Sequence, residues 1–497
     1  MKRVGKLTAL SFAAIMALSA LSGCSGTGET SSQGGNVSTS LDKEYTVSIH
    51  MPGDTQASEA KVENKLNELM ADLNVKIDIQ MIPVDEYKAQ MDRILLGQEK
   101  ADLIFTSASD GYVDTVAKMG FAELDGLLEQ YGKDITEAVY PNAFKGVKID
   151  GKIYACPTNK EIDNGVAFAF NKELVEKYNF DLSTVKKLSD IEPFLKVIKE
   201  NETDVTPAFI SKGNGLIEGD IAGWHTILNY AGYVRLDDNT LTVQNVLSEE
   251  FGAVEKEMYQ LMRDWFNKGY VNADAETTAE GPWKAWRNKL MWVKKDITKP
   301  YRAEELKALF GQDVVMVTIQ DVAVKNTQGA MMAISRNSKD QARAMMVLNR
   351  IYANAEVYNT LVYGIEGENY EVVKESPKTI RRISGNGYDA DLAWRIGDQF
   401  KSYLLEGEAE DKWEKFAEYN ESAVASPILG FNFDTTPVQN EIAQINNIYA
   451  EYWRGLCSGT SDVDARLAER NQRLKSAGIE KVTGEIQKQL NEWKSGK

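Results

Sequence analysis

Side chains that could support covalent or metal chemistry are few and widely separated in this chain. It contains only two histidines, His50 and His225, and three cysteines at positions 24, 156 and 457. None of these residues are spaced closely enough to form a metal cluster. The chain has no nucleophile elbow and no dinucleotide fingerprint, since Gly213-Asn214-Gly215 lacks the third glycine. We therefore predict neither a metal site nor a cofactor.

The remaining chemistry is that of carboxylates, amides and aromatic rings. The chain carries 74 Asp and Glu residues, so a pair of carboxylates at the separation that a secreted glycoside hydrolase needs stays open as one alternative. The other is recognition without reaction, in which aromatic rings stack on the flat C–H faces of a sugar and polar groups bind its hydroxyls. Formation of product from candidate oligosaccharides would separate the two.

The stretch Gly151 to Tyr178 carries the pattern from which we infer how the chain is divided into packed units. A short strand breaks at Cys156-Pro157, because proline removes a backbone donor and forces its predecessor into an extended conformation. A polar strip, Thr158 to Asn164, then leads to an apolar run, Val166 to Phe170, and to a helix. This pattern predicts a crossing between two packed units with a ligand beside it.

Composition and the N-terminus limit the location and the partners. A net charge of −17 argues against nucleic-acid binding. A basic start precedes a short apolar segment, Leu7 to Leu21, which is typical of a secretory signal at residues 1–23. Leu21-Ser22-Gly23-Cys24 resembles the lipobox of bacterial lipoproteins, which implies lipidation at Cys24. The Ser- and Gly-rich residues that follow predict a flexible tether over 24–41. We expect the folded part to lie on the outer face of the bacterial cytoplasmic membrane.

The first unit shows alternating strands and periodic helices. Strands are indicated at residues 45–49, 75–81 and 103–105, with helices between them. This β-α-β-α-β order requires a parallel sheet, and ligands bind past the carboxyl ends of such strands. Those ends carry small polar residues, so Asp54, Ser107 and Asp110 are candidate ligand-binding residues, although ordinary turn residues would look the same.

The second unit begins after the crossing. We expect a helix over Gly219 to Tyr233 that carries Trp224 and His225, and a long helix after Ser248. Further along, we expect helices near Asp389 to Tyr403 and over Val438 to Tyr452, and an amphipathic helix in the tail.

One segment, Gly281 to Arg302, is basic in an acidic chain and rich in tryptophan. It has two interpretations: a solvated basic face packed on acidic neighbours, or a cleft wall in which one of its indoles is a stacking surface and its cations donate hydrogen bonds. The second would permit a sugar that contains uronate. Binding whose affinity does not change with salt concentration would exclude such a uronate-containing ligand.

Several motifs carry a family resemblance. Asp150-Gly151-Lys152-Ile153-Tyr154-Ala155, with Pro157, and Phe170-Asn171-Lys172-Glu173-Leu174 resemble the extracellular solute-binding proteins of sugar ABC importers. Tyr363-Gly364-Ile365-Glu366-Gly367 and Leu429-Gly430-Phe431-Asn432-Phe433-Asp434 resemble the LplA-like lipoproteins with a DUF3502 C-terminal domain. The likeness runs across nearly the whole chain.

The resemblance implies an α/β fold of the type II periplasmic-binding-protein kind, with two lobes, an interlobe cleft and a hinge. The expected N-terminal lobe comprises 42–162 and 320–370. The expected C-terminal lobe comprises 163–319 and 371–497, of which 429–497 is the DUF3502-like part.

The same resemblance implies a function and further site residues. It implies a lipid-anchored, monomeric binding protein, not an enzyme, that captures an oligosaccharide and delivers it to the permease subunits of an ABC transporter. A neutral sugar is favoured over one that contains uronate, and a binding protein that feeds a sensor stays open. The residues that would bind the sugar by this resemblance are Glu161, Trp224 with His225, Trp292, Lys294, Phe431 and Asn432. Cys156 and Cys457 either pair or remain free.

Overall fold

The structure is a computed structural model that describes residues 40–162, 165–212, 215–217, 223–278, 280–320 and 323–496. The predicted signal peptide, Cys24 and nearly all of the predicted tether therefore lie outside the described residues. No helix in the described part is both long and apolar enough to cross a membrane.

A five-stranded sheet organises the first of two hydrophobic cores. Its strand order is β2-β1-β3-β12-β4, where β1 is parallel to β2 and β3, and β12 is antiparallel to β3 and β4. The parallel β-α-β-α-β start is thus confirmed. The strands are β1 (Tyr45–Pro52), β2 (Val75–Ile82), β3 (Leu103–Thr106), β4 (Ala155–Pro157) and β12 (Met331–Ile334).

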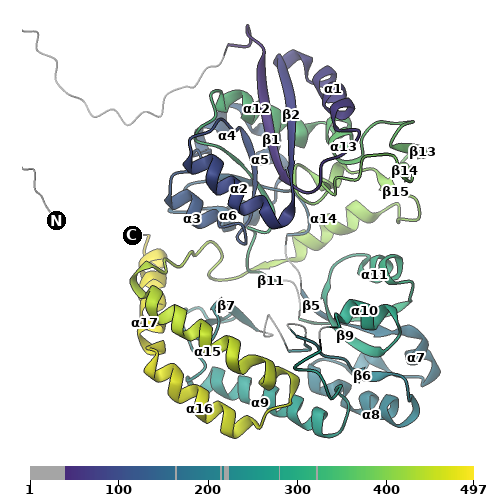
Figure 1. The fold of residues 1–497 in the computed structure, drawn as a ribbon, viewed down its shortest axis with the longest axis vertical. Coiled ribbons are helices and arrows are strands. Elements are labelled where there is room, and N and C mark those ends of the chain that lie inside the picture. The colour runs from purple at the N-terminus through teal and green to yellow at the C-terminus, as the bar shows by residue number, and fades with distance from the viewer. Residues whose placement is uncertain are drawn as a thin grey trace, which may run out of the picture. The chain divides into compact units, whose positions relative to one another are not determined.

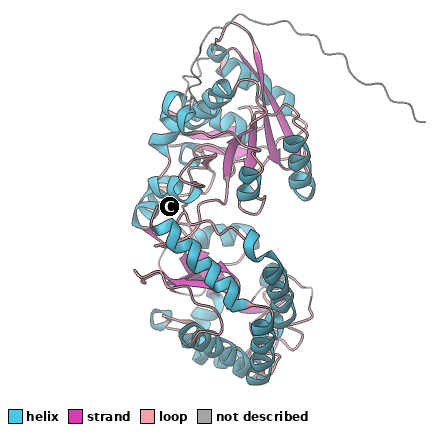
Figure 2. Cartoon of the chain, turned by 90° about the vertical axis from the view of Figure 1, so that its left-hand side faces the viewer, coloured by secondary structure: helices cyan, strands magenta, loops and turns pink. Residues whose placement is uncertain are grey.

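Helices pack around this sheet, and in Figure 2 its strands run between them. The residues of β1 from Val47 to Pro52 are all buried, because both faces of the sheet are covered. The helices that contribute to the first core are α1 (Glu59–Leu69), α2 (Val84–Leu96), α3 (Tyr112–Ala117), α4 (Asp125–Tyr131), α5 (Lys133–Ala138), α6 (Pro141–Val147), α12 (Gln341–Ala353) and α13 (Ala355–Tyr363). We call this part of the chain the first lobe.

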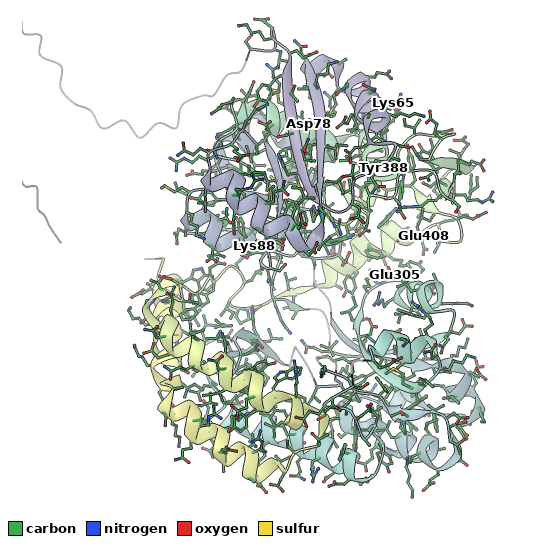
Figure 3. The ribbon with its side chains drawn as sticks, in the orientation of Figure 1. Lys65, Asp78, Lys88, Glu305, Tyr388 and Glu408 are labelled. Atoms are coloured by element: carbon green, nitrogen blue, oxygen red, sulfur yellow. The ribbon has the colours of Figure 1, made fainter. Side chains whose placement is uncertain are left out.

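Residues 371–423 also belong to the first lobe, so their assignment to the second lobe is wrong. Ile380, Leu392 and Ile396 are buried in the first core, and so is Tyr388, which Figure 3 labels among its elements. The segment stays in the first lobe because the chain forms a ribbon of three short strands directly after α13, before it crosses to the second lobe. The elements are β13 (Tyr370–Glu375), β14 (Lys378–Arg382), β15 (Leu404–Leu405) and α14 (Lys412–Ser422).

A four-stranded sheet begins the second lobe. Its order is β10-β5-β9-β6, and β5 is the strand predicted at the end of the crossing. The strands are β5 (Gly165–Asn171), β6 (Thr206–Ala208), β9 (Met291–Thr298) and β10 (Val314–Gln320), with helices α7 (Lys172–Lys177), α8 (Glu192–Asn201), α10 (Pro282–Arg287) and α11 (Arg302–Phe310).

Four long helices complete the second core, and they lie side by side in Figure 1. The tail prediction is confirmed, since Val482, Ile486 and Leu490 form the buried stripe of the last helix. Three of these helices come from the C-terminal segment: α15 and α16 pack against α9, and α17 packs against α15 and α16. They are α9 (Glu249–Asn267), α15 (Gln439–Ser458), α16 (Val463–Ser476) and α17 (Ile479–Lys494).

The helix predicted over Gly219 to Tyr233 is instead a hairpin of β7 (Trp224–Leu228) and β8 (Gly232–Arg235). Tyr230 takes a positive φ of 67° in the turn, which a helix does not allow. A side chain at Gly232 would meet Ile486 at 2.7 Å, so the hairpin passes close to α17. The apolar run that suggested a helix is buried by the tail helices, and its periodicity is therefore not diagnostic.

Candidate functional site

The polar loops of the first lobe converge on one edge of its sheet. β1 and β3 end there, β4 ends there, and the antiparallel β12 begins there, because Met331 pairs with both Thr106 and Pro157. Two backbone hydrogen bonds join the loops: Ala108 N–H donates to Gln328 O at 2.8 Å, and Thr158 N–H donates to Ala330 O at 3.0 Å. This edge is the ligand-binding position of such sheets.

The predicted residues at the ends of β1 and β3 lie along this edge. The Ser107 hydroxyl donates to the Asp110 carboxylate at 2.5 Å, and the Asp110 N–H donates back to the Ser107 oxygen at 3.2 Å. Ser107 is buried, so its role is to fix the turn, while Asp110 stays half-buried at the surface. Asp54 follows the neighbouring strand β1 and is exposed. The loops that follow the adjacent strands β1 and β3 thus lie at the same edge of the sheet, and ligand contact by these three residues stays a prediction.

A small pocket of about 120 Å³ opens where β4 ends and β12 begins. Thr158 and Glu161 line it from the crossing, and Tyr140 lines it from the start of α6. The Thr158 hydroxyl is buried and has no hydrogen-bond partner among the described residues. Ligand sites usually enclose roughly 300–1,000 Å³, so this pocket has room for only part of a ligand of ordinary size. We call it the Glu161 pocket.

Two lysines hold Glu161 in its charged form. Its carboxylate lies 3.1 Å from the Lys160 ammonium, and its side chain is only 13 % exposed. Burial alone would raise the pKa of Glu161, but the charges of Lys160 and Lys299 outweigh it and lower that pKa below its usual value. Asn420 on α14 fixes the crossing: its Oδ1 accepts from Ile162 N–H at 2.9 Å and its Nδ2 donates to Lys160 O at 2.8 Å.

Trp224 and His225 lie on the β7–β8 hairpin of the second lobe. Trp224 is nearly fully buried and packs edge-on against Phe251, with ring centroids 5.0 Å apart. His225 Nδ1 lies 2.7 Å from the hydroxyl of Ser426, in the segment that leads to the C-terminal helices. Both side chains therefore have structural partners in this conformation, and whether either contacts a ligand stays a prediction.

Trp292 does not form a cleft wall, so this prediction is wrong for the structure described. Its side chain is 0 % exposed, and rings from β5, from the turn after α7 and from α8 surround it. The reason is that β9 is an interior strand between β5 and β6, so one of its faces points into the second core. A fully buried indole has no face left for a sugar.

The lysines of the same segment follow the alternative interpretation, in which basic side chains pair with acidic neighbours. The Lys294 ammonium lies 3.2 Å from the Asp296 carboxylate and donates to the Lys295 carbonyl at 2.8 Å. Burial lowers the pKa of Lys294. Further pairs join Arg302 to Asp296 and to Glu305, the latter labelled on α11 in Figure 3. Lys294 is therefore committed to an internal ion pair.

Phe431 and Asn432 lie in a segment that connects the two cores. Ile428 is buried in the second core and the next residue, Leu429, in the first. The Asn432 amide donates to the Lys148 carbonyl at 3.0 Å and accepts from Gln328 Nε2 at 3.1 Å, both beside the sheet edge. Phe431 packs against Trp493. In this conformation Asn432 joins the connecting segment to Lys148 and Gln328 by hydrogen bonds. Ligand contact by Phe431 or Asn432 stays a prediction.

One residue at the edge was missed by the sequence analysis. Trp394 is 37 % exposed, and it is the one tryptophan among the large apolar side chains that are exposed in the described part. Its ring lies 6.3 Å from that of Phe105, next to the end of β3. The helix predicted near Asp389 to Tyr403 is replaced by turns that carry Trp394 over this edge. An Asp- and Gly-rich context was the available signal against a helix.

The described residues contain no group of three or more His, Cys, Asp or Glu side chains placed to hold a metal ion. Cys156 is buried in the first core and Cys457 in the second, and neither is in a disulfide. The open question about these two thiols is thus answered: they do not pair. The arrangement at the edge consists of hydrogen-bonding groups and the partly exposed ring of Trp394, which suits reversible binding of a polar molecule.

Comparisons with known proteins identify the class. Residues 55–367 match the family described as bacterial extracellular solute-binding protein, and residues 427–495 match DUF3502, a domain of unknown function. The chain belongs to this solute-binding family, and its fold is the type II two-lobe fold, as predicted.

Individual relatives are similar over nearly their whole length. A carbohydrate ABC transporter substrate-binding protein of Streptococcus pneumoniae serotype 4 is 30 % identical over 452 residues, covering 87 % of this chain and 89 % of the relative. The crystal structure of the N-glycan transport solute binding protein NgtS from Streptococcus pneumoniae is 29 % identical, with a TM-score of 0.80, covering 90 % of this chain and 98 % of that one. Structures of NgtS with Man1GlcNAc and Man5GlcNAc give TM-scores of 0.69 and 0.66.

Proposed function

We propose that this chain is the substrate-binding protein of a carbohydrate ABC importer and that it binds an oligosaccharide. The observation that carries the proposal is the likeness to a carbohydrate substrate-binding protein along almost the full chain, through both the solute-binding region and the DUF3502 segment. The sheet edge of the first lobe supplies hydroxyl-binding groups at the position where this fold binds ligands.

The ligand favoured by the site is a neutral saccharide. Lys160 and Glu161 pair with each other in the Glu161 pocket, so no uncompensated cation faces a uronate there. The buried Thr158 hydroxyl has no hydrogen-bond partner within the described part of the chain and is available to a ligand. An affinity of micromolar order corresponds to about 8 kcal/mol, which several hydrogen bonds and a stacked ring can supply.

The mechanism is closure of two lobes on the sugar. The two NgtS structures whose descriptions name a saccharide have lower TM-scores to this chain than the NgtS structure whose description names none. The coordinates of NgtS therefore differ among these structures. A ligand that contacts both lobes stabilises the closed arrangement by its differential affinity for it. For this chain, the described part of the crossing, 158–162, and the segment at 426–432 are the connections that would bend.

The proposal includes delivery without reaction. The chain hands an unaltered sugar to the permease subunits of the transporter, as a monomer tethered outside the cytoplasmic membrane by a lipid on Cys24. The rival function of a secreted glycoside hydrolase would need two free carboxylates at a fixed separation. At the sheet edge, Glu161 is paired with Lys160 and Asp110 accepts from Ser107.

Calorimetric titration and thermal shift with Man1GlcNAc, Man5GlcNAc, a malto-oligosaccharide and an oligouronate test the function. We expect a raised melting temperature with at least one neutral saccharide, because a ligand at a hundred times its dissociation constant stabilises by about 2.7 kcal/mol. Chromatography after incubation should recover the sugar unchanged. Formation of product would refute the binding function, and no shift with any saccharide would refute the carbohydrate ligand.

Matched variants test the site and the anchor. E161Q should weaken binding, while E173Q, which alters an exposed glutamate on α7 paired with Lys289, should not. C24A should release the exported chain from membranes into the medium. Retention of that variant on the membrane would exclude Cys24 as the anchor.

A further inference from the structure

The backbone of the crossing is held by the segment 397–420 of the first lobe. Asn159 N–H donates to Gly397 O at 2.9 Å, and the Asn159 amide donates to the buried carboxylate of Asp398 at 2.8 Å. Beyond Asn159, no strand of the described part pairs with the crossing until β5 begins. Buried backbone groups need hydrogen-bond partners, so the backbone around Glu161 depends on side chains for them.

The side-chain amide of Asn420 supplies these partners. Its Oδ1 accepts from Ile162 N–H at 2.9 Å, and its Nδ2 donates to Lys160 O at 2.8 Å. This N–H and this carbonyl belong to the two peptide groups that flank the Cα of Glu161. Because each peptide group is planar, a single amide that holds both of them fixes the backbone dihedrals of Glu161 and the direction of its Cβ.

The carboxylate of Glu161 depends on that direction. It lies 3.1 Å from the Lys160 ammonium, and the charges of Lys160 and Lys299 offset the burial of its own charge. A rotation of the Cβ would carry the carboxylate away from these charges and change what it presents to the Glu161 pocket. Asn420 is 3 % exposed and does not itself line that pocket, so its effect on a ligand passes through the residues that do.

We propose that Asn420 is a positioning residue for ligand binding, which holds the backbone on both sides of Glu161 so that the carboxylate faces the pocket. This inference rests on the proposed function and adds a residue, far along the chain, on which the geometry of the pocket depends. Loss of the Asn420 amide weakens the contact between Glu161 and the ligand although the carboxylate itself is unchanged.

Titration calorimetry on the full mature chain tests the inference. The probe is the tightest-binding member of the panel of Man1GlcNAc, Man5GlcNAc, a malto-oligosaccharide and an oligouronate. We expect N420A to weaken binding about tenfold, because a hydrogen bond to a charged group contributes about that factor or more. E161A should weaken it at least as much. In the E161A background, N420A should change the affinity by less than about twofold, because positioning has no effect without the side chain that is positioned.

The matched control variant is N369A. Asn369 is 1 % exposed, and its amide makes the same kind of contacts with no partner in the crossing: Oδ1 accepts from Ile365 N–H at 2.9 Å and Nδ2 donates to Asn386 O at 3.0 Å. N369A should lower the melting temperature about as much as N420A and leave the affinity unchanged. If N420A does not fold, N420S repeats the measurement, because a single hydroxyl cannot hold both peptide groups in place of the amide.

Three outcomes would overturn the inference while leaving carbohydrate binding intact: equal affinities of N420A and N369A, an undiminished affinity of E161A, or losses that multiply in the double variant E161A/N420A. If the wild type binds no saccharide of the panel, the proposed function fails and this inference fails with it.

Discussion

A buried ion pair between α9 and α16 gives the sharpest stability prediction. Arg470 is bidentate to Glu255, with Nη1–Oε1 and Nη2–Oε2 distances of 2.8 and 2.7 Å. The two side chains are 1 % and 5 % exposed. Burial alone would lower the pKa of Arg470, but the Glu255 charge outweighs it and raises that pKa. The pair fastens a DUF3502 helix to the solute-binding region.

The perturbation is E255Q, which keeps the shape of the side chain and removes its charge. The guanidinium then stays buried without a counter-charge, which typically costs about 3–5 kcal/mol. Tyr259, whose hydroxyl donates to Glu255 at 3.0 Å, keeps an acceptor in this variant. The loss therefore reports the missing charge together with one hydrogen bond from Arg470, because the amide nitrogen of glutamine cannot accept. We expect a fall of about 3 kcal/mol in the free energy of unfolding.

Urea unfolding followed by circular dichroism measures the effect, and the same helix supplies a matched control. Arg473 on α16 pairs with Glu451 on α15 at 2.7 Å, with both side chains more than 40 % exposed. E451Q should cost less than about 1 kcal/mol. The double variant E255M/R470M should recover most of the stability, because the buried charge disappears with its partner. If E255Q costs no more than E451Q, the reasoning about burial is wrong.

Three further predictions follow from individual residues. The pKa of Glu161 is lowered, so its ion pairs stabilise the folded state fully above the ordinary carboxyl pKa of about 4.3 and lose this contribution as the pH falls through the lowered value. The difference in unfolding free energy between wild type and E161Q should thus be constant from neutral pH down to about 5 and shrink in more acidic buffers. A difference that grows in acid would contradict this sign. Burial raises the pKa of the Cys156 thiol, so a thiol reagent should leave Cys156 and Cys457 unmodified in the native protein and label both in urea, whereas rapid native labelling would show that these sites open. Gly459 follows the last residue of α15 with a φ of 74°, and an added Cβ would lie 2.1 Å from the Met262 carbonyl oxygen, so G459A should destabilise the protein by at least about 1–2 kcal/mol. No atom of the described residues lies near an added Cβ at Gly484 within α17, so G484A should stabilise the protein by up to about 1 kcal/mol. Equal melting temperatures for the two variants would refute the steric argument.

The local pattern of the sequence determined the elements of the first sheet and the crossing. Alternation at 45–49 and 75–81 and helical spacing between them depend on neighbours within a few residues, so they can be read without a structure. The short strand expected at 152–154, with a break at Cys156-Pro157, is wrong, because the strand instead consists of Ala155–Pro157, which pairs with β12. The motifs around these elements also carried the family, which the comparisons confirmed. The positions of Asp54 and Ser107 directly after β1 and β3 could therefore be predicted from the sequence.

Tertiary structure alone decided which aromatic residues face the ligand edge. Trp292 and Trp394 both have apolar and basic neighbours in the sequence, yet the interior position of β9 buries the first and turns beside the first sheet leave the second partly exposed. The hairpin at 224–235 and the return of 371–423 to the first core depend in the same way on contacts with residues far along the chain. Such contacts leave no periodic signal, because burial of a side chain is set by whichever distant segment packs on it.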